Sequence, residues 1–197
     1  MGKEFILASS SRSRYKILKN SGFIFKKINP KCDEEKIKIK IFKLKKNPIK
    51  YVKKLSYEKA NSISNIKKYK NSFIIGCDTI ILLEKKIFDK AKTIYEAKKK
   101  IIELSNKKHK IISGVTIIKN GKKVCSFHET TVVKIKKLTN LEIKKYLKKT
   151  GKQILNSVGC YQIESLGPEI IEKIEGDFFN VMGIPLFRLL KYTSNIK

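Results

Sequence analysis

The chain has 197 residues, enough for one domain with a real core, and 41% of them are hydrophobic. Lys and Arg number 46 against 17 Asp and Glu, a net charge of +29, and the four cysteines lie too far apart for a disulfide scaffold or a zinc motif. No apolar run is long enough for a signal-peptide core or a membrane span. We expect a single cytoplasmic domain over residues 1–197.

The basic residues are overwhelmingly Lys, and they are spread evenly beside an excess of Ile and Asn. This combination is typical of an AT-rich genome, so we interpret the charge first as compositional and second as a nucleic-acid footprint. Under either interpretation the summed positive field favours the approach of polyanionic substrates.

The first third of the chain predicts two short strands around a helix, followed by a long helix. Residues 4–8 form a buried strand, residues 12–20 an amphipathic helix, and residues 23–28 a second strand. Residues 36–46 alternate Lys with apolar residues, which predicts a half-buried strand, with a loop as the alternative. Pro48 begins a helix that continues to residue 66.

The middle of the chain predicts a deeply buried strand, a helix and a hairpin. Residues 72–83 are apolar except around 76–79, a pattern typical of a strand buried on both faces. Thr93, with Glu96 three residues on, predicts a capped helix. Asn-Gly at 120–121 separates two strand-like segments, which indicates a hairpin.

The last quarter begins with a helix capped by Thr139 and Glu142 and ends with a helix from Leu186. Between these helices, glycines and prolines divide the chain into short segments. The order of elements predicts an α/β domain with a mixed, twisted sheet.

Asp78 is the most informative acid, because it interrupts the most hydrophobic strand. Burying an unpaired carboxylate is costly, so a compensating partner is required. A hydrogen-bonded structural Asp and a catalytic or metal-binding Asp are about equally compatible with this pattern.

The triplet Asp33-Glu34-Glu35 is either a solvated charge run or a second acidic centre that shares Mg²⁺ with Asp78.

Four hydroxyls and two guanidinium groups lie in SSSRSR at residues 9–14, between the first strand and its helix. One serine suffices as an N-cap. Backbone N–H groups and the macrodipole at a helix N-terminus attract phosphate, so Ser9, Ser11, Arg12 and Arg14 predict a turn that binds phosphate oxygens.

Several common catalytic signatures are missing from the sequence. His109 and His128 have no partner His or Cys at metal-ligand spacing, which favours structural or surface roles. The P-loop, H-E-x-x-H and G-x-S-x-G patterns do not occur.

Taken together, nine segments in order resemble the Maf family, the nucleotide pyrophosphatases also called septum-formation inhibitor proteins. They are LASSSRSRYKIL at 7–18, DEE at 33–35, SYEKA at 56–60, GCDT at 76–79, DKA at 89–91, SGVTII at 113–118, ETTVV at 129–133, GCYQIESLG at 159–167 and GDFFNVMGIPL at 176–186. Any one alone is a weak signal, but their agreement in order and spacing is specific.

The resemblance implies a two-lobed α/β fold like that of the inosine triphosphate pyrophosphatases, with a central cleft for substrate. It implies hydrolysis of a nucleoside triphosphate between the α and β phosphates to monophosphate and pyrophosphate, dependent on Mg²⁺ or Mn²⁺. The substrates are expected to be modified or non-canonical nucleotides, and the family is linked to arrest of cell division. A homodimer is left open, and no membrane association is expected.

The resemblance also implies roles for particular residues. The family's general base falls on Asp78, its acidic metal ligand on Glu34, and its phosphate contacts on Arg14, Lys59 and Lys90. Ser9 and Ser11 line the phosphate turn. Asp78 is thereby expected both to activate water and to share the metal ion. Positions that tune base choice are matched by Ser13, Thr79 and Glu164.

The chain departs from the family pattern at three places. The usual S-P-R-R is Ser11-Arg12-Ser13-Arg14, and the usual K-P is Lys90-Ala91. The Gln of the thymidine/uridine triphosphate branch is Glu164. A carboxylate only accepts hydrogen bonds, so it favours a base edge rich in N–H donors, or a cationic base. Glu164 thus resembles the 7-methyl-GTP branch, whereas Thr79 resembles the other.

Two alternatives to the pyrophosphatase come from different functional classes. One is a basic nucleic-acid-binding module, although Tyr and Phe are scattered and no RNA-binding signature is present. The other is an inactive regulator of cell division that binds nucleotide and partner proteins. Pyrophosphate release separates the enzyme from both.

Overall fold

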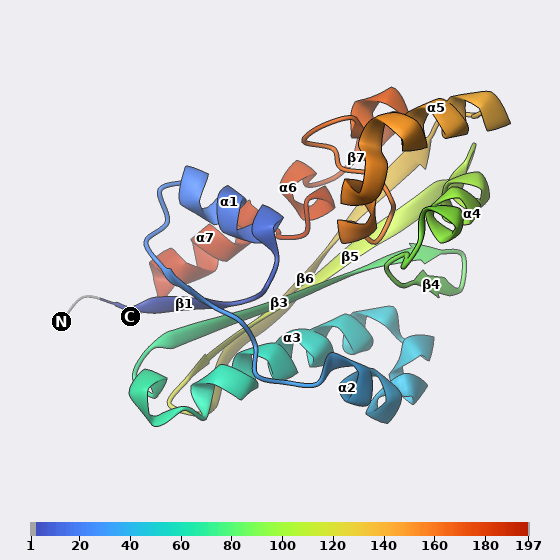
Figure 1. Cartoon of the computed structure of the whole chain (residues 1–197). Coiled ribbons are helices and arrows are strands. Elements are labelled where there is room, and N and C mark those ends of the chain that lie inside the picture. The colour runs from blue at the N-terminus through green and yellow to red at the C-terminus, as the bar shows by residue number, and fades with distance from the viewer. Residues whose placement is uncertain (1–2, 197) are drawn as a thin grey trace. The chain divides into compact units, whose positions relative to one another are not determined.

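The computed structural model describes residues 3–196 and shows an α/β protein (Figure 1). A mixed seven-stranded sheet has the order β2-β1-β3-β5-β6-β7, with β4 paired to β3. The predicted fold class is therefore confirmed. The strands are β1 Phe5–Ala8, β2 Lys26–Ile28, β3 Phe73–Leu83, β4 Lys86–Phe88, β5 Lys108–Lys119, β6 Lys122–Ile135 and β7 Ile171–Glu175.

Helices connect many of the strands along the described chain, although β3 leads directly to β4 and β5 to β6. The α-helices are α1 Arg12–Asn20, α2 Glu34–Lys40, α3 Pro48–Ser64, α4 Ile94–Leu104, α5 Asn140–Thr150, α6 Phe178–Val181 and α7 Leu186–Asn195. The short 3₁₀ helices are η1 Phe42–Lys46, η2 Lys67–Tyr69, η3 Gly151–Asn156 and η4 Gly167–Glu169. Within residues 3–196, no helix combines the length and apolar character that crossing a membrane requires.

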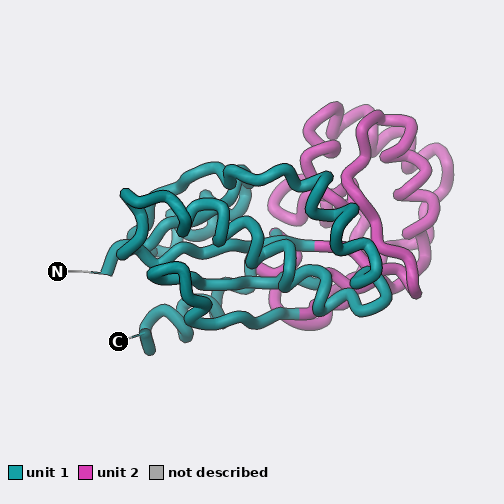
Figure 2. The backbone as a smooth tube through the Cα atoms, turned by 90° about the horizontal axis from the view of Figure 1, so that it is seen from below, with its two compact units in different colours: residues 1–79, 112–129, 183–197 teal, residues 80–111, 130–182 magenta. Residues whose placement is uncertain are grey.

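The chain divides into two compact units (Figure 2). Unit 1 comprises residues 1–79, 112–129 and 183–197, and unit 2 comprises residues 80–111 and 130–182. Both units are thus discontinuous in sequence, and the long strands β3, β5 and β6 contribute residues to each.

In unit 1, β1 is parallel to both β2 and β3, with Ala8 opposite Gly76. In Figure 1, α3 lies on one side of these strands and α1 and α7 lie on the other. The apolar side chains between the strands and α3 include Ile6, Ile63 and Ile74, all fully buried. This two-sided cover explains why β3 is apolar over almost its whole length.

In unit 2, β4 is antiparallel to the end of β3, and β7 is antiparallel to β6. Apolar residues of α4 and α5 pack into one core with these strands, among them Ile101, Leu104, Ile143 and Leu147. Thr139 and Glu142 form the predicted capping box, with each side chain bonded to the other residue's backbone N–H.

The predicted strand over residues 36–46 is wrong, because this segment forms α2 and η1. Asp33 caps α2 by accepting a hydrogen bond from the Lys36 N–H, and acidic residues in the first turn and lysines in the last complement the helix dipole. No residue of α2 is buried. Local capping and charge therefore decide the structure, and the alternation of Ile and Lys does not.

Other boundaries differ by smaller amounts. The second strand is shorter than predicted, β3 continues unbroken past Asp78, and the sequence did not predict β4 and β7. The Asn120-Gly121 hairpin is confirmed, and both residues have the positive φ of the favoured two-residue turn. Asp78 accordingly lies inside a strand and not at its end.

Candidate active site

The turn between β1 and α1 is organised by two of its serines. The Ser11 hydroxyl caps α1 by accepting a hydrogen bond from the Arg14 N–H at 3.3 Å. The Ser9 hydroxyl, which is buried, accepts one from the Ser11 N–H at 3.2 Å. The turn therefore directs the side chain of Arg14 inward, while Arg12 is exposed and Ser13 is half-buried.

Arg14 is held by three protein acceptors. Its Nε donates to the Gly183 carbonyl at 2.7 Å, its Nη1 to the Ser9 hydroxyl at 3.3 Å and its Nη2 to the Thr79 hydroxyl at 2.9 Å. A guanidinium has five N–H groups, and these bonds use three of them. The remaining two lie on different terminal nitrogens, from which a guanidinium can donate to phosphate oxygens.

Asp78 has the partner that its burial requires. The Lys59 ammonium, on α3, donates to Asp78 Oδ1 at 2.6 Å and lies 3.2 Å from Glu34 Oε1. The side chains of Lys59 and Asp78 are 9% and 13% exposed, and that of Glu34 is 40% exposed. The structure thus brings together three of the predicted site residues around one nitrogen atom.

The pKa of Lys59 has opposing contributions. Burial acts to lower it, but the negative charges of Asp78 and Glu34 outweigh burial, and the pKa is raised above its usual value. Lys59 therefore stays positively charged. Because Asp78 Oδ1 is engaged by Lys59, Oδ2 is the carboxylate oxygen left to accept a further hydrogen bond.

Gly76 explains how α3 comes close enough for this contact. A Cβ atom at Gly76 would lie 2.0 Å from the Ser56 carbonyl oxygen and 2.9 Å from the Ala60 Cβ. Only glycine therefore permits this approach of α3 to β3, two residues before Asp78. The sequence signal, a lone glycine in a buried strand, is typical of close backbone approach, but sequence reasoning did not identify its partner.

The acidic triplet does not act as a unit. The Asp33 side chain caps α2, and the Glu35 carboxylate pairs with Lys38 at 3.0 Å, so only Glu34 contacts Lys59. Within residues 3–196 no group of three or more His, Cys, Asp and Glu residues could hold a metal ion. Two carboxylates that contact one ammonium nevertheless form an oxygen donor set that suits Mg²⁺, which keeps water and substrate phosphates as further ligands.

Lys90 and Glu164 belong to unit 2, so their placement is described within that unit alone. Lys90 is exposed in the segment between β4 and α4, and Glu164 is exposed in a turn that precedes η4. Their predicted roles in phosphate binding and base choice stay predictions.

The sequence did not predict the roles of Ser113 and Gly183. Ser113 is fully buried on β5, with its hydroxyl 2.8 Å from that of Thr79, and Gly183 supplies the carbonyl that binds Arg14. Both residues lie within segments that carry the family resemblance, SGVTII and GDFFNVMGIPL. Gly183 has φ of +102°, which favours glycine.

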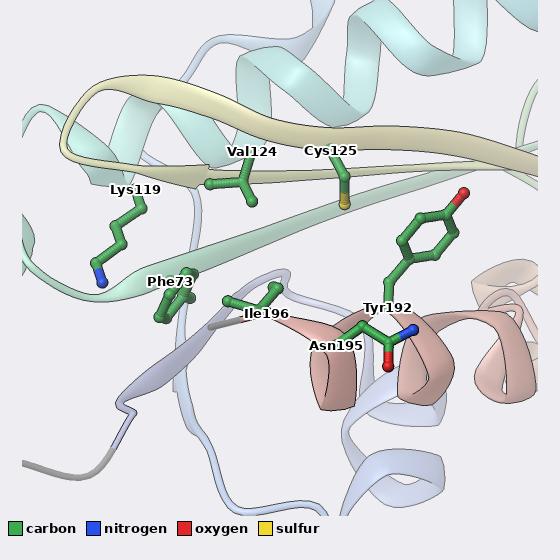
Figure 3. A pocket seen from close by; sticks show the side chains of 7 residues that line it. All are labelled: Phe73, Lys119, Val124, Cys125, Tyr192, Asn195 and Ile196. Atoms are coloured by element: carbon green, nitrogen blue, oxygen red, sulfur yellow. The ribbon is translucent and has the colours of Figure 1, made fainter.

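The hollow drawn in Figure 3 lies elsewhere in unit 1. It has a volume of about 420 Å³ and is lined by residues that include Phe73 of β3, Cys125 of β6 and Tyr192 of α7. None of the predicted site residues lines it. The candidate site is therefore defined by its hydrogen bonds and charges and not by this hollow.

Unit 1 of this α/β fold thus holds Lys59 between two carboxylates, and it holds Arg14 at the N-terminus of α1, where backbone N–H groups favour anions. The chain belongs to the Maf family, whose model, described as Maf-like protein, matches residues 4–196.

Curated relatives cover nearly the whole chain. It is similar to a nucleoside triphosphate pyrophosphatase of Pelagibacter ubique, 35% identical over 197 residues and all of both chains. It is similar to a 7-methyl-GTP pyrophosphatase of Bartonella quintana, 37% identical over 96% of this chain and 94% of the relative. It is also similar to a dTTP/UTP pyrophosphatase of Thermosipho melanesiensis, 39% identical over 94% of each. These close identities do not separate the three named activities.

Proposed function

We propose that this protein is a nucleoside triphosphate pyrophosphatase, which hydrolyses the α–β phosphoanhydride to give a monophosphate and pyrophosphate. The activities named for its relatives support the reaction class. The single observation that supports the mechanism is the buried Asp78 carboxylate, paired with Lys59 in the same unit as Arg14.

In this proposal Asp78 is the general base. Lys59 fixes Oδ1 at 2.6 Å, which orients the carboxylate and leaves Oδ2 to take a proton from the attacking water. Arg14 and Lys59 are cations in a largely buried setting, where they stabilise negative charge on the phosphoryl oxygens and the leaving pyrophosphate. Lys90 is the third phosphate contact that the family resemblance implies.

Glu34 and Asp78 are the residues that would hold a divalent cation, Mg²⁺ or Mn²⁺. Such an ion supplies Lewis-acid polarisation of phosphate oxygens and neutralises their charge. Ser9 and Ser11 shape the β1–α1 turn so that the guanidinium of Arg14 is directed to the phosphates.

The base is selected by Ser13, Thr79 and Glu164, the three positions matched to base choice. A carboxylate accepts hydrogen bonds and attracts positive charge, which favours a base with several N–H donors or a cationic base such as 7-methylguanine. Modified nucleotides of this kind are the expected substrates.

A screen of canonical and modified nucleoside triphosphates with Mg²⁺ or Mn²⁺ tests the proposal. Pyrophosphate, and not orthophosphate, is the expected product for at least one nucleotide. Release of orthophosphate alone, or of neither product, would contradict it. Retention of nucleotide binding without pyrophosphate release would instead favour an inactive regulator.

A further inference from the structure

Residues 159–167 of unit 2 form a tight turn on which Glu164 is exposed. The Gln162 carbonyl oxygen accepts hydrogen bonds from the Ser165 N–H at 3.1 Å and from the Gly167 N–H at 2.8 Å. These two bonds enclose Glu164, so the path of its backbone is fixed relative to Gln162. A Cβ atom at Gly167 would lie 2.5 Å from the same carbonyl oxygen, and glycine is therefore needed to close the turn in this way.

Tyr161, the residue before Gln162, anchors this turn in the core of unit 2. Its side chain is buried, and its ring lies over Gly159, where a Cβ atom would be 2.5 Å from Tyr161 Cε1. Cys160, between these two residues, is fully buried and has a φ of +55°, which is uncommon for a residue with a side chain. Such a backbone conformation persists only where the surrounding contacts determine it, and the packing of the Tyr161 ring provides one of them.

His109 of β5 binds the far end of the Tyr161 ring. Its Nε2 lies 2.6 Å from the Tyr161 hydroxyl, and both side chains are buried. Within residues 3–196 the other ring nitrogen, Nδ1, has no hydrogen-bond partner. An apolar residue would fill this space without the cost of an unpartnered buried nitrogen, so what the imidazole contributes here is its hydrogen bond to Tyr161.

We propose that His109 and Tyr161 are positioning residues for base choice, because their hydrogen bond fixes the turn that presents Glu164 to the base. The proposal rests on the proposed function, in which Glu164 takes part in selecting the base. In this role both residues act through the backbone of residues 161–164 and do not touch the base. Ile163 also packs into the core of unit 2, so loss of the hydrogen bond is expected to loosen the turn and not to unfold it.

Binding of nucleotides with different bases tests this role without turnover. Calorimetry with Mg²⁺ measures dissociation constants for α,β-methylene nucleoside triphosphates, whose α–β bridge resists hydrolysis, and for inorganic tripolyphosphate, which has no base. Preference is the ratio of the constants for the two bases that the native chain distinguishes most. In Tyr161→Phe and in His109→Leu this ratio is expected to fall about threefold to tenfold, the effect of losing one hydrogen bond. Tripolyphosphate binding is expected to be unchanged.

A double variant and a rescue test whether the two side chains act as one unit. Combining Tyr161→Phe with His109→Leu should lower the ratio no more than either change alone, because both changes break the same hydrogen bond. His109→Gln keeps a hydrogen-bonding group on a side chain of similar reach, and it is expected to retain most of the native ratio.

Tyr146→Phe is the matched control for the loss of a tyrosine hydroxyl. Tyr146 of α5 is buried in the same unit, and in the part of the chain that the structure describes its hydroxyl has no hydrogen-bond partner. Its removal should therefore leave the preference unchanged. Thermal melts identify any variant that does not fold, and if His109→Leu is such a variant, the more conservative Tyr161→Phe decides.

A native ratio in both Tyr161→Phe and His109→Leu would overturn the proposal, as would an equal weakening for every nucleotide and for tripolyphosphate. Additive effects in the double variant, or equal binding of all bases by the native chain, would overturn it as well. Failure of the proposed function is a separate result: the native chain releases no pyrophosphate from any nucleotide, while the binding ratios still decide whether His109 and Tyr161 position the turn.

Discussion

Each unit contains a buried polar contact of 2.6 Å, and these two contacts differ in charge. In unit 1 the Lys59 ammonium donates to Asp78 at 2.6 Å. In unit 2, His109 Nε2 lies 2.6 Å from the Tyr161 hydroxyl. Both pairs are almost fully removed from water, so burial itself does not distinguish them.

The pKa shifts of His109 and Tyr161 favour their neutral forms, whereas the pKa shift of Lys59 favours its charged form. Burial lowers the pKa of His109 to about 4, since no charged partner offsets the cost, and burial raises the pKa of Tyr161. Lys59 meets the same cost of burial, but Asp78 and Glu34 outweigh it and its pKa is raised. A charged partner therefore decides whether a buried group keeps its charge, and chemistry that needs charge is expected in unit 1.

Removing the carboxylate of Asp78 tests the charged pair most directly. Asp78→Asn is nearly isosteric but a poor base, so pyrophosphate release is expected to fall by about 10² to 10⁴. Initial rates are measured at matched Mg²⁺ concentration, with circular dichroism to confirm the fold. Full turnover by the folded variant would remove Asp78 from the role of base.

Replacing Lys59, the cation of the charged pair, should instead lower the free energy of unfolding. Lys59→Met leaves Asp78 buried without its partner, and we expect a loss of about 3–5 kcal/mol in the free energy of unfolding. Urea denaturation measures this loss. Lys54→Met is the matched control on α3, because Lys54 pairs with Glu58 while 42% of its side chain is exposed, and it should cost less than about 1 kcal/mol. Equal effects would mean that burial of the pair is unimportant.

The neutral pair predicts a pH dependence of stability. The pKa of His109 is about 4 in the folded chain and 6.5 in the reference state, so between these values the unfolded chain binds more protons. The contribution of neutral His109 to the free energy of unfolding is complete above pH 6.5. It is lost as the pH decreases toward 4, and the loss is at most about 3 kcal/mol.

Urea denaturation across this pH range checks the prediction, with His109→Gln expected to flatten the slope. The pKa of His128 is also lowered, by burial and by the nearby charges of Arg188 and Lys53. His128 lies in a more exposed position than His109. His128→Gln should therefore keep most of the slope. An unchanged slope in His109→Gln would assign the pH dependence to other groups.

Sequence reasoning reached the features that depend on local chemistry. The helix of residues 12–20 and the capping box of Thr139 and Glu142 follow from periodicity and capping, and the structure confirms both. Sequence reasoning failed at residues 36–46, where the alternation of Lys and apolar residues indicated a strand. The segment is helical instead, and Asp33 caps its first helix.

The candidate site shows the same limit. The sequence indicated Asp78 through the cost of a buried carboxylate, but the pairing with Lys59 depends on the approach of α3 at Gly76. The Ser113 and Gly183 contacts likewise join segments that are distant in sequence. Such contacts are properties of the folded chain, and residue type and spacing do not specify them.

A substitution of Glu164, in unit 2, tests whether this carboxylate affects the choice of base and not the rate of hydrolysis. Glu164→Gln removes a negative charge and adds a donor, so we expect preference among bases to shift by about tenfold while the rate on the best nucleotide changes little. Competition between nucleotide pairs measures the preference. Glu169→Gln is the matched control, because Glu169 is an exposed carboxylate of unit 2 that pairs with Lys149, and its loss should leave preference unchanged. A uniform loss over all nucleotides in Glu164→Gln would show that this carboxylate supports the reaction itself and does not select the base.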